Sequence, residues 1–259
     1  MDLELAGKVV VITGGSDGLG LGLARTLLRE GARVAVCGRD SGRLGEAESV
    51  LRQSGGEVLT IQADVSHLDD LDRLITTTYD RWGRLDGLVN NAGTSAARPF
   101  MSVTDAEWLQ DLELKLFAAL RSSRLAHAYL AASGTGSIVN VLNIGAKAPR
   151  SRSMPTSVSR AAGMAFTKAL SKEWGPDGIR VNAVLIGLIE SGQWVRRAQI
   201  QGVSTAELYA RMVKETDIPL GRVGRAEEFA DLAAFLLSMR SGYITGCAIN
   251  LDGGTSPAV

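Results

Sequence analysis

The fold is decided by one stretch near the start of the chain, Lys8-Val-Val-Val-Ile-Thr13-Gly14-Gly-Ser-Asp-Gly18-Leu-Gly20. Its first half is a short, apolar, β-branched run, which predicts a buried β-strand. Apolar residues with helical spacing follow it, at Leu21, Leu23, Ala24, Leu27 and Leu28. Glycines between a strand and a helix let the backbone come close to a pyrophosphate, and the helix N-terminus attracts its negative charge. The stretch therefore predicts the phosphate-binding turn of a dinucleotide-binding fold, although an ordinary turn between a strand and a helix also fits it.

A second strand is predicted over residues 31–37, and it ends in Gly38 followed by Arg39. A dinucleotide-binding fold contacts the ribose of its cofactor at this strand end, where an acidic side chain favours NAD. An arginine can instead form a bidentate pair with the 2′-phosphate of NADP(H). Arg39 therefore favours NADP(H) over NAD(H); the alternative is that Arg39 is only a solvated loop residue.

Strand-like and helix-like patterns alternate along the whole chain. Helices are expected near 18–30, 40–53, 67–82, 104–130, 154–175 and 226–238, and strands near 8–13, 33–37, 57–63, 85–89, 136–142, 178–184 and 247–250. This alternation predicts an α/β fold with a doubly wound parallel sheet, the Rossmann fold, which binds ligands at the carboxyl ends of its strands. Residues 185–219 form a long insertion after the sixth strand, and such excursions are usually lids or substrate-binding loops.

The composition fits a single domain over residues 1–259. With 45% hydrophobic residues and 28 basic against 28 acidic groups, the chain can bury one full core and carries no charge excess for binding nucleic acid. It lacks a signal-peptide pattern and any apolar run of roughly 18 residues, so we expect a cytoplasmic protein without membrane contact. No metal site is expected from its two histidines and two cysteines. Cys37 and Cys247 fall in predicted strands, so both are expected to be buried.

The chain resembles the short-chain dehydrogenase/reductase family, in its classical single-domain form, over nearly its whole length. The motifs that carry the resemblance, in the family's order and spacing, are Thr13-Gly-Gly-Ser-Asp-Gly-Leu-Gly20, Asp64-Val65, Asn90-Asn-Ala-Gly93, Ile179-Arg-Val-Asn182, Gly221-Arg222, Thr245-Gly246 and Asp252-Gly-Gly254. The resemblance implies a homotetramer or homodimer, formed through the helices near 104–130 and 154–175 and the C-terminal strand. It also implies these cofactor contacts: Gly14, Ser16, Gly18, Leu19 and Gly20 at the pyrophosphate, Asp64 and Val65 at the adenine, Asn91, Ala92 and Gly93 beside the central strand, and Ile189 and Ser191 at the nicotinamide.

All four catalytic positions of the family carry other residues in this chain. Where the family has Tyr-x-x-x-Lys, the chain has Thr156 and Arg160; Asn143 stands at the serine position and Lys115 at the asparagine position. Thr156 cannot replace the tyrosine as an acid, because its alkoxide is far too unstable, and we interpret it as a lost function. Arg160 stays charged and can still hold the ribose hydroxyls, while Asn143 can donate to a carbonyl oxygen.

Lys115 is the remaining candidate for proton transfer. A lysine that is desolvated beside the fixed charge of Arg160 has its ammonium form disfavoured, which allows proton abstraction or Schiff-base formation. The alternative is that Lys115 pairs with Asp111, one helical turn earlier, and only supports packing.

Three functions are compatible with this sequence. The preferred one is an atypical NADP(H)-dependent oxidoreductase acting on a carbonyl or hydroxyl group of a small molecule, with Lys115 or a water supplying the proton. The second is a non-redox enzyme that uses Lys115 for aldol or retro-aldol cleavage, dehydration or isomerisation. The third is a non-catalytic NADP(H)-binding sensor or partner subunit. The two expected cations, Lys115 and Arg160, favour an anionic substrate. Apolar residues of the insertion favour a substrate that is partly apolar.

Overall fold

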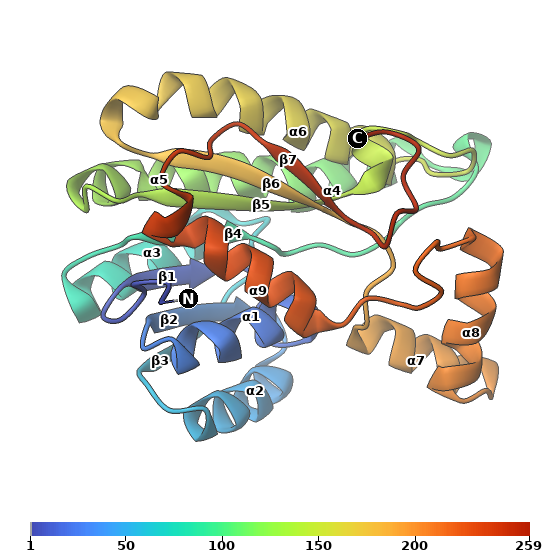
Figure 1. The fold of residues 1–259 in the computed structure, drawn as a ribbon, viewed down its shortest axis with the longest axis horizontal. Coiled ribbons are helices and arrows are strands. Elements are labelled where there is room, and N and C mark those ends of the chain that lie inside the picture. Colours follow the sequence, from blue (N-terminus) through green and yellow to red (C-terminus); the bar gives the residue numbers. More distant parts are fainter. Residues whose placement is uncertain (1) are drawn as a thin grey trace.

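In the computed structural model, which describes residues 2–259, seven parallel strands form one sheet in the order β3-β2-β1-β4-β5-β6-β7 (Figure 1). The strand order reverses between β1 and β4, and this reversal opens a crevice at the carboxyl ends of the central strands. The predicted Rossmann fold is thereby confirmed. The strands are β1 Val9–Ile12, β2 Arg33–Gly38, β3 Val58–Gln62, β4 Gly87–Asn90, β5 Ser137–Asn143, β6 Arg180–Ile186 and β7 Ala248–Leu251.

Helices cover both faces of the sheet (Figure 1). On one face, α1 packs against α9, and Leu23, Leu27 and Phe229 lie in the core between these helices and the sheet. On the other face, Leu71 of α3 and Leu130 of α5 belong to a second core. The helices of the first face are α1 Gly18–Arg29, α2 Ser41–Gln53 and α9 Ala226–Leu237, and those of the second are α3 Leu68–Trp82, α4 Asp105–Leu112, α5 Ala118–Ala132 and α6 Thr156–Glu173.

The central strands are buried on both faces, which explains their apolar sequences. All four residues of β1 are buried, whereas all four of β7 are only partly buried, because β7 lies at the edge of the sheet and pairs with β6. Cys37 in β2 is buried as expected. The expectation for Cys247 is wrong: this residue precedes β7 at the sheet edge and is exposed. None of the helices within residues 2–259 is both long and apolar enough to cross a membrane.

The helix predicted near 104–130 is interrupted. Between α4 and α5 lies a π-helical turn, Glu113–Phe117, which contains Lys115. A π turn inserts one residue into the helical repeat, and such turns are frequent at functional sites. The side chain of Lys115 points toward α6, where it reaches Thr156.

The insertion at 185–219 contains two helices, α7 Gly192–Gln201 and α8 Thr205–Thr216. They lie apart from the main sheet (Figure 1) and pack on each other through a small apolar cluster that includes Ala198 and Leu208. An ion pair of 2.8 Å between Arg196 and Asp17 connects α7 to the glycine turn.

Candidate active site

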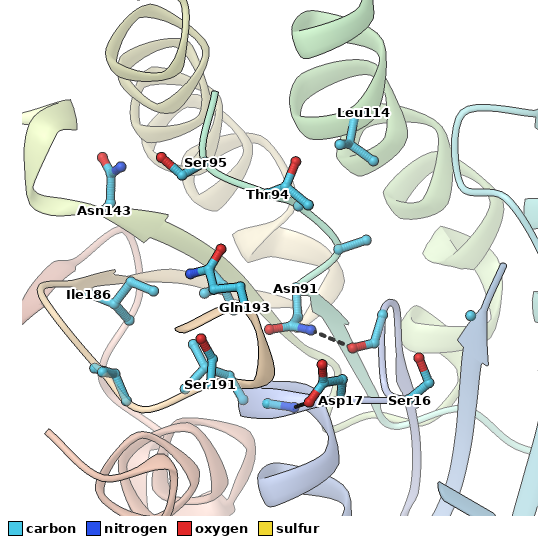
Figure 2. Close-up of a pocket in the computed structure, with 18 of the residues that line it drawn as sticks. Ser16, Asp17, Asn91, Thr94, Ser95, Leu114, Asn143, Ile186, Ser191 and Gln193 are labelled. Atoms are coloured by element: carbon cyan, nitrogen blue, oxygen red, sulfur yellow. Dashed lines mark hydrogen bonds between the residues drawn. The ribbon is translucent and has the colours of Figure 1, made fainter. Parts of the chain in front are cut away.

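A cavity of about 360 Å³ lies at the carboxyl ends of the central strands, where the strand order reverses. Figure 2 shows Ser16 and Asp17 at one end of it and Asn143 with Ser95 at the other. Gly20, Asp64 and Lys115 are not among its lining residues. The predicted site residues that line it are Gly14, Ser16, Gly18, Leu19, Arg39, Val65, Asn91, Ala92, Gly93, Asn143, Thr156, Arg160, Ile189 and Ser191.

The glycine turn is held against the end of β4. The side-chain amide of Asn91 donates to the carbonyl oxygens of Thr13 and Gly14, at 2.9 Å each. Gly14 has a φ of 71°, in the left-handed region that favours glycine. Gly20 packs closely against the turn: a Cβ atom at this position would lie only 2.4 Å from the carbonyl oxygen of Gly14. The turn therefore depends on glycine both for its conformation and for its packing.

Two arginines line the end of the cavity beside β2. Arg39 follows the strand, and Arg43 lies one helical turn later, in the first turn of α2. The Arg39 guanidinium is largely exposed and lies 3.8 Å from Asp64, a distance that constrains it weakly. Asp64 itself accepts hydrogen bonds from the backbone and hydroxyl of Ser66. Arg43 lies 3.5 Å from Asp40, so each of the two guanidinium groups at this end of the cavity has one carboxylate nearby.

The opposite end of the cavity carries Asn143, Thr156 and Arg160. The Asn143 Oδ1 atom is buried and has no hydrogen-bond partner within residues 2–259. Arg160 donates from Nη1 to the carbonyl oxygen of Val141 at 2.8 Å. Burial lowers the pKa of Arg160 to about 10, against the opposing effect of Asp111, so the guanidinium keeps its charge at neutral pH.

Lys115 lies behind Thr156. Its side chain is fully buried, forms an ion pair with Asp111, and donates from Nζ to Thr156 Oγ1 at 3.1 Å. Burial lowers the pKa of Lys115 to about 8, with a further lowering by the charge of Arg160 and an opposing effect of Asp111. Of the two cations expected in the pocket, Arg160 therefore lines the cavity, and Lys115 reaches it only through a hydroxyl group.

Comparisons with known proteins agree with this fold. A family model described as enoyl-(acyl carrier protein) reductase matches residues 14–256. The 3-oxoacyl-(acyl-carrier-protein) reductase FabG of Chlamydia pneumoniae is 34% identical over 254 residues, which cover 98% of this chain and 99% of the relative. The chain belongs to the short-chain dehydrogenase/reductase family.

Solved structures of family members superpose closely on this short-chain dehydrogenase/reductase. L-sorbose reductase from Gluconobacter frateurii, complexed with NADPH and L-sorbose, has a TM-score of 0.94 at 33% identity, with 100% of both chains covered. The NADPH-bound short chain oxidoreductase from Pseudomonas aeruginosa PAO1, described as containing an atypical catalytic center, has a TM-score of 0.92 at 37% identity. That match covers 97% of this chain and 98% of the other.

Several groups at the site of this dehydrogenase/reductase do not follow from its sequence motifs. Ser159 donates to the second carboxylate oxygen of Asp111 at 2.6 Å, a contact that joins α6 to α4. Arg43 could have been predicted from the sequence, because it is a second arginine four residues after Arg39. The other unexpected lining residues come from the loop after β4 and from the insertion; they are Thr94, Ser95, Leu114, Gln193 and Trp194.

Proposed function

We propose that this protein is an NADP(H)-dependent oxidoreductase that acts on a carbonyl or hydroxyl group of a small molecule through an atypical catalytic centre. The observation that carries the proposal is one cavity that extends from Arg39 and Arg43 to Asn143 and Thr156. It joins an end lined by two partly exposed arginines, suited to a 2′-phosphate, to a polar end suited to a substrate oxygen. L-sorbose reductase, which matches the chain over its full length, is complexed with NADPH.

The residues present fit such a cofactor. Ser191 Oγ is buried and, among residues 2–259, has no hydrogen-bond partner, although it lines the cavity beside the glycine turn. A Cβ atom at Gly93 would lie 2.6 Å from Arg160 Nη2, so the glycine leaves room for that guanidinium. The glycine turn would hold the pyrophosphate, Val65 the adenine, and Arg160 the nicotinamide ribose. Ile189 and Ser191 would hold the nicotinamide, which when bound exchanges a hydride with the substrate carbon.

The polar end of the cavity can stabilise charge on a substrate oxygen. Asn143 has an amide that can donate, and the guanidinium of Arg160 is a permanent positive charge in a desolvated position. Donors and charges that are fixed before the reaction stabilise an oxyanion more effectively than water does. Leu114, Ile186 and Trp194 line the same cavity and favour a partly apolar substrate.

The position of Lys115 favours redox chemistry over Schiff-base chemistry. A Schiff base requires the lysine nitrogen to bond directly to the substrate carbon, but the Lys115 side chain is fully buried behind Thr156. To test the function, the protein is incubated with NADPH and a panel of aldehydes and ketones, while cofactor absorbance and the product carbon skeleton are both followed. NADPH oxidation with an unchanged skeleton supports the proposal. Skeleton cleavage without oxidation indicates a lyase, and cofactor binding without turnover indicates a sensor.

Replacing Arg39 with alanine is expected to weaken NADPH binding by about tenfold and to leave NADH binding nearly unchanged. A charge-assisted hydrogen bond contributes about 1.5–3 kcal/mol, and Arg43 compensates for part of the loss. Both cofactors are titrated calorimetrically against the wild type, the variant and Arg52→Ala, an exposed control on α2. Equal affinity of the wild type for the two cofactors contradicts the NADP(H) preference.

We also propose that the protein is a homodimer or homotetramer. Leu109 of α4, Phe117 of the π-helical turn and Val158 of α6 are exposed apolar side chains on the two helical segments for which the family resemblance implies association. Light scattering coupled to size-exclusion chromatography tests this state; a monomer at micromolar concentration contradicts it.

A further inference from the structure

The hydroxyl of Thr156 already accepts two hydrogen bonds. One comes from the backbone N–H of Ala96 and the other from Lys115 Nζ, each at 3.1 Å. A threonine hydroxyl has two lone pairs and one hydrogen. With both lone pairs engaged, the hydrogen is left to donate in another direction. Because Thr156 lines the cavity, this hydrogen is available to a substrate oxygen bound there.

Behind Thr156, a row of buried polar groups leads away from the cavity. Lys115 is paired with one carboxylate oxygen of Asp111, and Ser159 donates to the other at 2.6 Å. The side chains of Lys115 and Asp111 are 0% and 4% exposed. The row therefore runs from Ser159 through Asp111 and Lys115 to Thr156, and all four residues are buried.

This environment makes Lys115 a better proton donor than an ordinary lysine. Of the residues that the structure describes, the charged groups acting on it are Asp111 on α4 and Arg160 on α6. Burial and the nearby guanidinium lower its pKa from 10.5 to about 8. General acids are most effective when their pKa lies near the working pH.

We propose that Lys115 is the proton source of the reaction and that Thr156 relays its proton to the substrate oxygen, with Asp111 and Ser159 holding Lys115 in place. This inference rests on the proposed oxidoreductase function. As the carbonyl carbon gains a hydride from NADPH, the carbonyl oxygen takes the hydroxyl hydrogen of Thr156. Oγ1 takes a proton from Nζ at the same time, so the ammonium becomes an amine and later regains a proton from solvent. Thr156 never becomes an alkoxide, so its high pKa is no obstacle.

The relay is tested with three variants that differ in what they remove. Thr156→Ser keeps the hydroxyl and is expected to retain kcat within a few-fold. Thr156→Val keeps the shape without the hydroxyl, and Lys115→Met removes the charge at similar length; both are expected to lose about 100-fold in kcat. NADPH affinity is expected to stay within about twofold in all three. Full activity in either Thr156→Val or Lys115→Met overturns the relay.

The pH dependence gives a second readout. The wild-type rate of carbonyl reduction is expected to fall as the pH rises through about 8, because the Lys115 ammonium is lost there. The Lys115→Met variant is expected to show no such fall; its reduction rate is low and does not change with pH. A Lys115→Met profile with the same step shows that another group supplies the proton.

A third readout needs no turnover. The chain has six lysines, so ¹³C labelling at their ε-carbons gives a simple NMR spectrum in which Lys115→Met removes one signal. That signal is expected to titrate near pH 8. A Lys115 that stays protonated beyond pH 10 overturns the relay, even if the enzyme proves active. Conversely, NADPH binding without reduction of any carbonyl refutes the proposed function while this titration still reports on Lys115.

Discussion

Replacing Gly20 with alanine is expected to weaken NADPH binding by more than about 100-fold. The new Cβ atom would lie 2.4 Å from the carbonyl oxygen of Gly14 and 2.7 Å from Asn91 Nδ2. Both contacts are far shorter than van der Waals distances, and Asn91 is itself bonded to the backbone of the turn. The turn must therefore move, and it then loses the close approach of its backbone to the pyrophosphate. Isothermal titration calorimetry with NADPH measures the loss.

The matched control is Gly45→Ala. Gly45 lies within α2, and a Cβ atom there meets nothing within 4 Å. Because alanine favours helix more than glycine, this variant is expected to bind NADPH normally and to be more stable by up to about 1 kcal/mol. Tight NADPH binding by a folded Gly20→Ala variant contradicts the assigned role of the turn.

Replacing Asp111 with alanine is expected to lower the free energy of unfolding by about 3–5 kcal/mol. The substitution leaves the ammonium of Lys115 buried without its anionic partner and close to the positive charge of Arg160. It also removes one of the two acceptors of the Ser159 hydroxyl, which can still donate to the carbonyl oxygen of Thr156 at 3.0 Å. Urea unfolding at pH 7, followed by circular dichroism, measures the change.

Two further variants separate the ion pair from general effects on α4. Asp111→Leu combined with Lys115→Met replaces both charges by apolar groups and is expected to recover most of the lost stability, although not the activity. Asp105→Ala, at the exposed start of the same helix, is expected to change stability by less than about 1 kcal/mol. A stability of Asp111→Ala equal to that of Asp105→Ala shows that Lys115 does not depend on its carboxylate partner.

The strands and the cofactor turn were predictable because local patterns determine them. The β-branched run at 9–12 and the glycines after it place a buried strand before a helix without any knowledge of distant residues. The sequence predicts helical structure near 104–130, but it does not predict the interruption of this helix. Nothing in its apolar spacing reveals the π-helical turn at Glu113–Phe117, which packs against α6, a helix more than 35 residues later in the chain.

The catalytic end of the site was only partly predictable, because its contacts join distant parts of the chain. The four-residue spacing of Asp111 and Lys115 suggested their ion pair. However, the two donors to Thr156 come from residues 41 and 60 positions away, and neither partner can be read from local sequence. Thr156 was therefore interpreted as a lost function, whereas its contacts in the fold support our proposal that it relays a proton.

The most direct test of the proposed function is transfer of deuterium from NADPH labelled at C4 of the nicotinamide to the carbonyl carbon of a substrate. Wild-type protein and both stereoisomers of the labelled cofactor are incubated with each carbonyl compound of the panel, and the products are analysed by mass spectrometry. We predict that one stereoisomer yields an alcohol carrying one deuterium on carbon and that the other yields an unlabelled alcohol. Products without deuterium from either stereoisomer, or cleaved products formed without NADPH, would contradict the oxidoreductase function.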